Sequence, residues 1–239
     1  MADFANDVVL LTEGGDDLGR TLVQTLVARG ARVVFALRGP ASDAPEGSIA
    51  VTVEGWGRAA VEPLVAAALE RWGRVDVLLN HALHLTQGGL GEITLGDWNA
   101  TLERNLDAVY HAARVVLKPM TKGRYGRIVN ITGLQGLAGS YGQAAYAAAS
   151  GGVIGLTHAL ARETAPWNIT VNAVALGLIE GDILARLPAE VQRQGLNVSA
   201  LRRVGTLAEA IAPILFLASR EASFLSGQVV SVDGGWMMA

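Results

Sequence analysis

The chain has no cysteine, few aromatic residues and little charge of either sign. Of its 239 residues, 5% are aromatic and 17% are charged, and the formal net charge is −3. The lack of cysteine excludes disulfides, thiolate metal sites and a cysteine nucleophile. The small net charge gives no reason to expect nucleic acid or an anionic membrane surface as a partner.

Long hydrophobic runs are also missing. No signal peptide and no apolar stretch of about 18 residues is present, so the sequence predicts a soluble, cytoplasmic protein without a membrane partner. Half of the residues, 51%, are nevertheless hydrophobic, which is enough for one large core. No linker divides the chain, and we expect a single domain over residues 1–239.

Short apolar runs alternate with longer helical patterns along the chain. Seven runs are expected to be strands buried on both faces of a parallel sheet: Val8–Leu11, Arg32–Leu37, Ile49–Val53, Val75–Leu79, Arg127–Ile131, Thr170–Ala175 and Gln228–Val232. Five segments are expected to be helices: Leu18–Arg29, Arg58–Trp72, Leu95–Lys118, Tyr146–Thr164 and Leu207–Ala218. This alternation predicts an α/β fold with a doubly wound sheet. The irregular segment 178–203 is expected to lie over the carboxyl ends of the strands as a substrate lid.

The loop between the first strand and the first helix is acidic. Phosphate-binding loops at this place use glycines and backbone N–H groups at the start of the helix. Here the segment Thr12–Gly19 carries Glu13, Asp16 and Asp17. A carboxylate about 4 Å from a phosphate charge costs roughly 4 kcal/mol at an effective dielectric of 20. Acids at a helix start are also good caps, so we expect these three to stabilise the helix instead of binding pyrophosphate.

Taken as a whole, the chain from Val8 to Gly235 resembles the short-chain dehydrogenase/reductase family. The motifs that carry the resemblance are Val75–Asn80, Gly126–Ile131, Tyr146 on an alanine-rich helix, Thr170–Val174 and Ser226–Gly235. The resemblance implies a Rossmann-like domain with a seven-stranded parallel sheet flanked by helices. It also implies NAD(P) binding and a dimer or tetramer.

The residues expected to hold the cofactor match the family only in part. Thr12 and Gly19 fit its phosphate loop, but Glu13 and Asp17 replace two of its glycines. Asn80 matches the Asn after the fourth strand, and Leu83 places a branched side chain where the cofactor ribose would pass. Arg38 stands where NADP-using relatives often carry an arginine, although a solvated surface charge is the favoured interpretation. We therefore expect no tightly bound cofactor, and NADP in preference to NAD if one binds.

The catalytic residues that the resemblance implies are also incomplete. Tyr146 matches the proton-transferring tyrosine, and Asn105 matches the asparagine of the proton relay. The family's lysine, four residues after the tyrosine, is Ser150, and its serine, thirteen residues before, is Gly133. Without a neighbouring cation, a tyrosine keeps a pKa near 10. His81 and His84 have no third ligand, so no metal site is expected.

Three functions remain open from the sequence. The favoured one is a catalytically silent subunit that associates with an active homologous dehydrogenase/reductase in a hetero-oligomer, with self-association as the other form of assembly. The second is an NAD(P)-dependent oxidoreductase for carbonyls or alcohols, in which Tyr146 works with Thr132 or His84. The third is a small-molecule binding protein that uses the vacated pocket.

Overall fold

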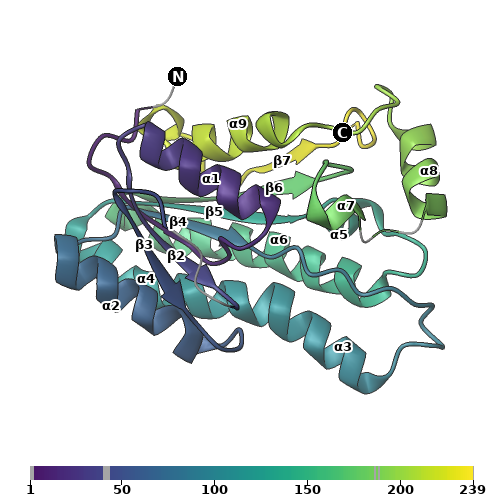
Figure 1. Ribbon diagram of the computed structural model, residues 1–239, viewed down its shortest axis with the longest axis horizontal. Helices are drawn as coiled ribbons and strands as arrows, with labels where there is room; N and C mark the ends of the chain where they lie inside the picture. The colour runs from purple at the N-terminus through teal and green to yellow at the C-terminus, as the bar shows by residue number, and fades with distance from the viewer. Residues whose placement is uncertain (1–2, 40–43, 186, 188, 239) are drawn as a thin grey trace.

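Seven parallel strands form the central sheet, in the order β3-β2-β1-β4-β5-β6-β7 (Figure 1). The computed structural model describes residues 3–39, 44–185, 187 and 189–238. The strands are β1 (Val8–Leu11), β2 (Arg32–Leu37), β3 (Ser48–Thr52), β4 (Val77–His81), β5 (Gly126–Gly133), β6 (Ile169–Leu176) and β7 (Val229–Val232). The order reverses direction after β1, so the predicted Rossmann-like, doubly wound, seven-stranded sheet is confirmed.

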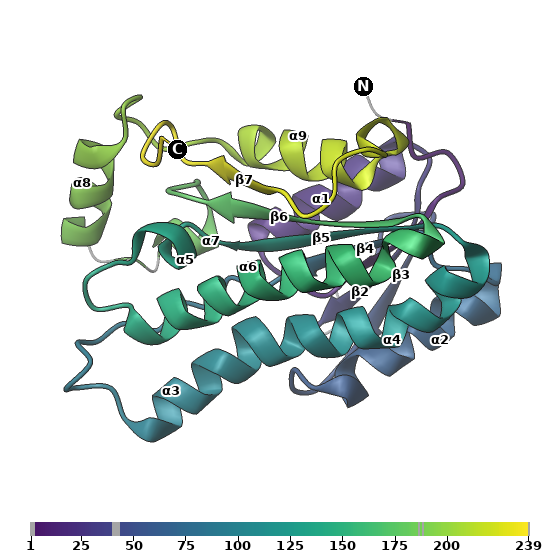
Figure 2. The same cartoon turned by 180° about the vertical axis from the view of Figure 1, so that it is seen from behind.

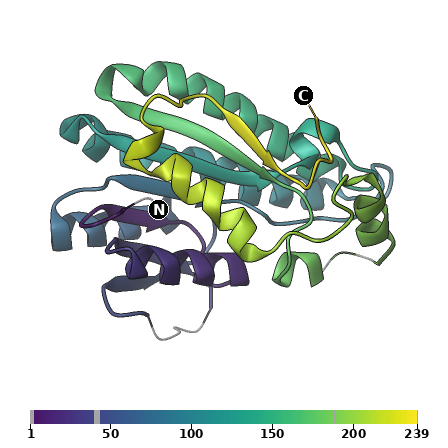
Figure 3. The same cartoon turned by 90° about the horizontal axis from the view of Figure 1, so that it is seen from above.

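Helices cover both faces of the sheet (Figures 1 and 3). Helices α1 (Asp17–Ala28) and α9 (Leu207–Ala218) lie on one face. Helices α2 (Arg58–Trp72), α4 (Ala108–Gly123) and α6 (Ala144–Thr164) lie on the other. Successive side chains of a strand point to opposite faces. The apolar residues of β1 therefore enter two separate cores, with Val9 and Leu11 in one and Val8 and Leu10 in the other.

The long helix expected over Leu95–Lys118 is interrupted. It consists of α3 (Leu95–Leu102), a π-helical turn (Glu103–Asp107) and α4, which continues to Gly123. Such turns insert one residue into a helix and occur often at functional sites. The turn places Asn105 inside the protein, where its side chain is fully buried. Figure 2 shows α3 and α4 running beside α6 on this face.

Helix α6 and the short helix that follows it are apolar enough to be mistaken for a membrane span. The segment Ala144–Trp167 is the one described helical stretch with the length and hydropathy for this, and half of its apolar window is buried inside the protein. Packing against β5 and β6 accounts for its composition.

Three short helices gather at the carboxyl end of the sheet (Figure 1). They are α5 (Gln135–Ala138), α7 (Asp182–Ala185) and α8 (Ala189–Val198), none of which the sequence pattern predicts. The described part of segment 178–203 thus contains two helices instead of being irregular, and a bridge between Ile179 and Gly205 ties its start to the chain beyond its end. This end of a doubly wound sheet is where ligands bind.

Candidate functional site

Tyr146 lies at the carboxyl end of the sheet beside a small apolar cavity. The cavity has a volume of about 50 Å³, and most of its lining is aliphatic: Leu18, Leu83, Leu85, Leu176, Leu178, Ile179, Ile183, Leu187 and Leu207, with Gln135, Tyr146, Gly177 and Glu180. Tyr146 comes from the first turns of α6 and is 1% exposed. Burial raises the pKa of its phenol above the ordinary value, and among the described residues only the Ser150 hydroxyl opposes this shift. The phenol therefore stays protonated at neutral pH.

The two positions that depart from the family lie directly against Tyr146. A Cβ atom built on Gly133 would be 2.5 Å from the Tyr146 hydroxyl, so the phenol occupies the space of a side chain at this position. Ser150 lies one turn further along α6 and is fully buried. Since its hydroxyl is neutral, it supplies no charge that would lower the pKa of Tyr146.

Asn105 is held by the backbone around it. Its amide oxygen accepts a hydrogen bond from the His84 N–H at 2.8 Å, and its amide nitrogen donates to the His84 and Thr101 carbonyls, both at 2.9 Å. These three bonds fix the chain after β4. They account for the buried side chain without any proton relay, and the role in a relay stays a prediction.

Carboxylates occupy the backbone amides at the start of α1. The Gly15 N–H donates to Glu13 at 2.9 Å, the Asp17 N–H to Asp182 at 3.1 Å, and the Gly19 N–H to Asp16 at 2.8 Å. Asp16 is the N-cap residue, which confirms that this acid stabilises the helix. Asp182 belongs to α7, so the lid segment contributes one of the three carboxylates.

A cation or histidine accompanies each carboxylate. Arg38 donates to Glu13 at 2.8 Å, the His81 ring lies 2.9 Å from Asp16, and Arg20 lies 3.5 Å from Asp182. For the buried pair, burial alone would raise the pKa of Asp16, but the charge and hydrogen bond of His81 lower it to about 2. Burial alone would lower the pKa of His81, but the charge and hydrogen bond of Asp16 have the larger effect, so the pKa of His81 is raised.

Arg38 is not the solvated charge that the sequence allows. Its side chain is 17% exposed, and its guanidinium also donates to the Thr12 carbonyl at 2.8 Å. The guanidinium carbon lies 3.6 Å from the ring centre of Trp56, in a cation–π contact. The opposite alternative, a contact with NADP, stays a prediction.

His84 and Thr132 do not line the cavity of Tyr146. The ring of His84 packs edge-on against Trp56, with 4.0 Å between the ring centres. Burial and the neighbouring cations lower the pKa of His84 to about 3, which leaves the ring neutral. Thr132 is buried in β5. A role for either residue beside Tyr146 stays a prediction.

The remaining predicted cofactor residues bind other parts of the chain. The Thr12 hydroxyl accepts from the His81 N–H at 2.9 Å and so ties the end of β1 to the end of β4. The side-chain amide of Asn80 donates to Asn130 at 2.8 Å inside the core. Gly19 offers its N–H, but Asp16 already accepts it. A cofactor role for these three residues stays a prediction.

A groove of about 280 Å³ lies where the nucleotide would be expected. It is lined by Glu13, Gly15, Asp16, Arg38, Trp56, Leu83, His84, Asp182 and Ile183. Leu83 and Ile183 also line the Tyr146 cavity and so separate the two spaces. With three carboxylates on the amides that a phosphate needs, the residues as arranged oppose a pyrophosphate at the start of α1 and would weaken its binding.

The sequence pattern misses two residues of this region. Gln135 lines the Tyr146 cavity from α5, and Asp182 reaches α1 from α7. Both follow strand ends by a few residues, at the edge of the sheet where ligands bind, and this position is the signal that could have found them. No group of three histidine, aspartate or glutamate side chains in the described part of the chain is arranged to hold a metal ion.

Comparisons with known proteins match nearly the whole chain. A family model described as "Enoyl-(Acyl carrier protein) reductase" matches residues 16–237. The 3-oxoacyl-[acyl-carrier-protein] reductase FabG of Salmonella typhimurium is 35% identical over 243 residues, which cover 98% of this chain and 99% of that protein. The corresponding reductase MabA of Mycobacterium tuberculosis is 34% identical over 235 residues, covering 98% and 94%.

A solved structure shows the same likeness. The crystal structure of gox2181 superposes with a TM-score of 0.92 at 29% identity, over 98% of this chain and 96% of that one. The prediction of a catalytically silent subunit is wrong on these comparisons, because the relatives that align with nearly the whole chain are named as reductases. No finding supports the hetero-oligomer that accompanied this prediction.

Proposed function

Because the chain belongs to the short-chain dehydrogenase/reductase family, we propose that it is an oxidoreductase that reduces the carbonyl group of an apolar substrate. The observation that carries the proposal is the protonated hydroxyl of Tyr146 beside an aliphatic cavity at the carboxyl end of the sheet. The atypical residues around it make the site a variant within the family.

Tyr146 supplies the proton in this reaction. Reduction of a ketone adds a hydride to the carbonyl carbon and a proton to its oxygen. Burial raises the pKa of Tyr146, so the phenol is a weaker acid than a free tyrosine but is present in its protonated form at neutral pH. It still donates to a developing alkoxide, which is far more basic than a phenolate. After this transfer the phenolate regains its proton from solvent.

The substrate is proposed to be a 3-oxoacyl thioester. The relatives' names support this class, and the cavity lining is chemically suited to an acyl chain. A volume of about 50 Å³ holds only a few atoms, since a single water needs about 10–15 Å³ by this measure. Ile183 and Leu187 line the cavity, so segment 178–203 is proposed to act as a lid that moves when substrate enters.

The reductant is proposed to be NADPH in preference to NADH, bound weakly. Arg38 is the cation that lines the groove, and a 2′-phosphate would be drawn to it. Glu13, Asp16 and Asp182 line the same groove and repel the pyrophosphate, which is why the affinity is expected to be low.

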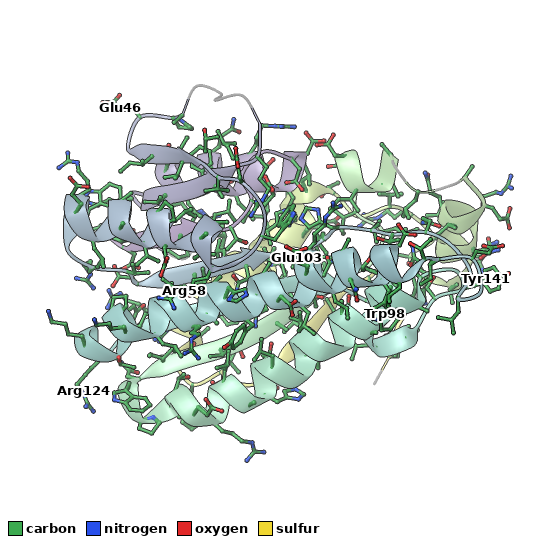
Figure 4. All side chains as sticks on the ribbon, turned by 90° about the horizontal axis from the view of Figure 1, so that it is seen from below. Glu46, Arg58, Trp98, Glu103, Arg124 and Tyr141 are labelled. Carbon is green, nitrogen blue, oxygen red and sulfur yellow. The ribbon has the colours of Figure 1, made fainter. Side chains whose placement is uncertain are left out.

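Steady-state kinetics test the proposal. With acetoacetyl N-acetylcysteamine thioester and millimolar NADPH, we expect NADPH oxidation and a roughly thousandfold loss of kcat in Tyr146→Phe, since general acid catalysis contributes about 10²–10⁴. Tyr141→Phe is the matched control, because Tyr141 is 94% exposed at the outer edge of the molecule (Figure 4). Equal rates in wild type and Tyr146→Phe would reject the proposal.

The protein is proposed to self-associate. Its location in the cytoplasm stays a prediction. Phe224 is fully exposed at 101% and Leu225 is 37% exposed, a few residues before the edge strand β7. Exposed apolar side chains beside an unpaired strand edge favour contact with a second chain. Light scattering should show an oligomer for wild type and a smaller species for Phe224→Ser. A monomeric wild type would reject this assembly.

A further inference from the structure

Two polar side chains flank the space beside Gly133. A Cβ atom built on this glycine would lie 2.5 Å from the Tyr146 hydroxyl and 2.6 Å from the Gln135 side-chain oxygen. The two polar atoms therefore face the same point. Both residues line the aliphatic cavity, whose other lining side chains, apart from Glu180, have no polar group.

The backbone holds Gln135 in this position. Gln135 begins the short helix α5, and its carbonyl accepts the Gly139 N–H at 2.9 Å. The next residue is Gly136, and a Cβ atom there would lie 2.6 Å from the Ser150 carbonyl carbon on α6. Helix α5 thus packs directly against the helix that carries Tyr146, and a shift of one relative to the other is restricted.

We propose that Gln135 is a catalytic residue that binds the substrate carbonyl together with Tyr146. This inference rests on the proposed reductase function. The side-chain amide of glutamine has an oxygen at one end and an NH₂ donor at the other, and a half-turn exchanges them. With the NH₂ toward Gly133, Gln135 and Tyr146 both donate to one carbonyl oxygen. The amide supplies the neutral donor that Gly133 lacks.

Gly133 and Gln135 then form a compensating pair. A side chain at position 133 would overlap both the Tyr146 hydroxyl and the Gln135 amide, so glycine there is what lets the amide face the cavity. Restoring a serine at this position should therefore damage the site while Gln135 is present. Removing the long side chain at the same time should relieve the overlap with the amide and recover part of the loss, while the overlap with Tyr146 remains.

The test is a double-mutant cycle on the reductase assay. We expect Gln135→Leu to lower kcat/KM roughly a hundredfold, the usual loss when one donor to a developing oxyanion is removed. We expect Gly133→Ser alone to lower it, and Gly133→Ser with Gln135→Ala to recover at least tenfold over Gly133→Ser. Gln24→Leu on the exposed face of α1 is the control and should match wild type.

A binding measurement separates this inference from the proposed function. Calorimetric titration with 3-hydroxybutanoyl N-acetylcysteamine thioester requires no turnover. We expect at least tenfold weaker binding in Gln135→Leu, with unfolding temperatures within the range of the control. Unchanged binding and unchanged kcat/KM in Gln135→Leu would overturn the role of Gln135, as would a gain of activity in Gly133→Ser alone. Absence of turnover with Gln135-dependent binding would reject the reductase function and keep the contact.

Discussion

Removing carboxylates from the start of α1 should strengthen nucleotide binding. Glu13 lies 2.9 Å from the Gly15 amide nitrogen, the place that a phosphate oxygen would take, and Asp182 lies 3.1 Å from the Asp17 nitrogen. Substituting Glu13→Gln or Asp182→Asn keeps the size and an acceptor oxygen but removes the negative charge. The changes therefore isolate electrostatic repulsion from loop geometry.

The size of the effect follows from distance and exposure. Two unit charges about 4 Å apart repel by roughly 4 kcal/mol at an effective dielectric of 20. Glu13 is 10% exposed but is partly neutralised by Arg38, so about half of that energy, ~2 kcal/mol, is expected, which is about thirtyfold in affinity. Asp182 is 40% exposed and more strongly screened, so about fivefold is expected.

Fluorescence titration with NADPH and calorimetry with inorganic pyrophosphate measure these changes. Glu46→Gln is the matched control, because Glu46 is exposed and precedes the amino end of β3, away from the groove (Figure 4). The gain should shrink at high salt, as expected for a charge effect. Changes below threefold in both variants, or weaker binding, would refute the electrostatic account of the loop.

Three further predictions concern pH and packing. The ion pair of Asp16 and His81 should be intact between about pH 4 and 6.5, where it adds roughly 2 kcal/mol to the free energy of unfolding. This stabilisation is lost as the pH falls through the lowered pKa of Asp16, about 2. It is also lost as the pH rises through the raised pKa of His81. Unfolding temperatures should accordingly fall above pH 6.5 in wild type, and an identical slope in Asp16→Asn would contradict this. The reduction rate should show no loss from deprotonation of Tyr146 up to about pH 10, because burial raises its pKa, so a rate that falls with an apparent pKa near 8 would count against Tyr146 as the acid. Leu83 is 8% exposed and lies between the two cavities, so Leu83→Ala should lower the free energy of unfolding in urea by roughly 2–4 kcal/mol. The control Leu90→Ala, at a side chain 70% exposed, should lower it by less than about 0.5 kcal/mol.

The sheet could be predicted from the sequence because its signal is local. Runs such as Val8–Leu11 are apolar at every position, which is typical of a strand buried on both faces. The π-helical turn at Glu103–Asp107 was not predictable in this way. Residues on both sides of it keep helical spacing, and the extra residue is accommodated by the contacts of buried Asn105 with the loop after β4.

The candidate site was predicted less completely, for a different physical reason. The acids of the loop after β1 are visible in the sequence, and the helix-capping role of Asp16 followed from its position. The contact of Asp17 with Asp182 joins residues 165 positions apart, and no local pattern encodes it. The same holds for Arg38, whose environment depends on Glu13 and Trp56 coming together across three strands.

The prediction of a catalytically silent protein is wrong because the relatives that align with nearly the whole chain are named as reductases. Gly133 and Ser150 are indeed neutral and small, and they leave Tyr146 without a cation. Yet the space beside Gly133 holds the amide of Gln135, two residues further along the chain. A site can exchange one hydrogen-bond donor for another, and motif matching at fixed positions does not detect this.

The most direct test of the central claim is product analysis with deuterium-labelled NADPH. Purified protein is incubated with acetoacetyl N-acetylcysteamine thioester and millimolar cofactor, and the 3-hydroxy product is quantified by mass spectrometry. Reduction through Tyr146 predicts product carrying one deuterium at C3 in wild type and in Tyr141→Phe, and a loss of at least a hundredfold in Tyr146→Phe. No labelled product above the protein-free background, or equal amounts from wild type and Tyr146→Phe, would contradict it.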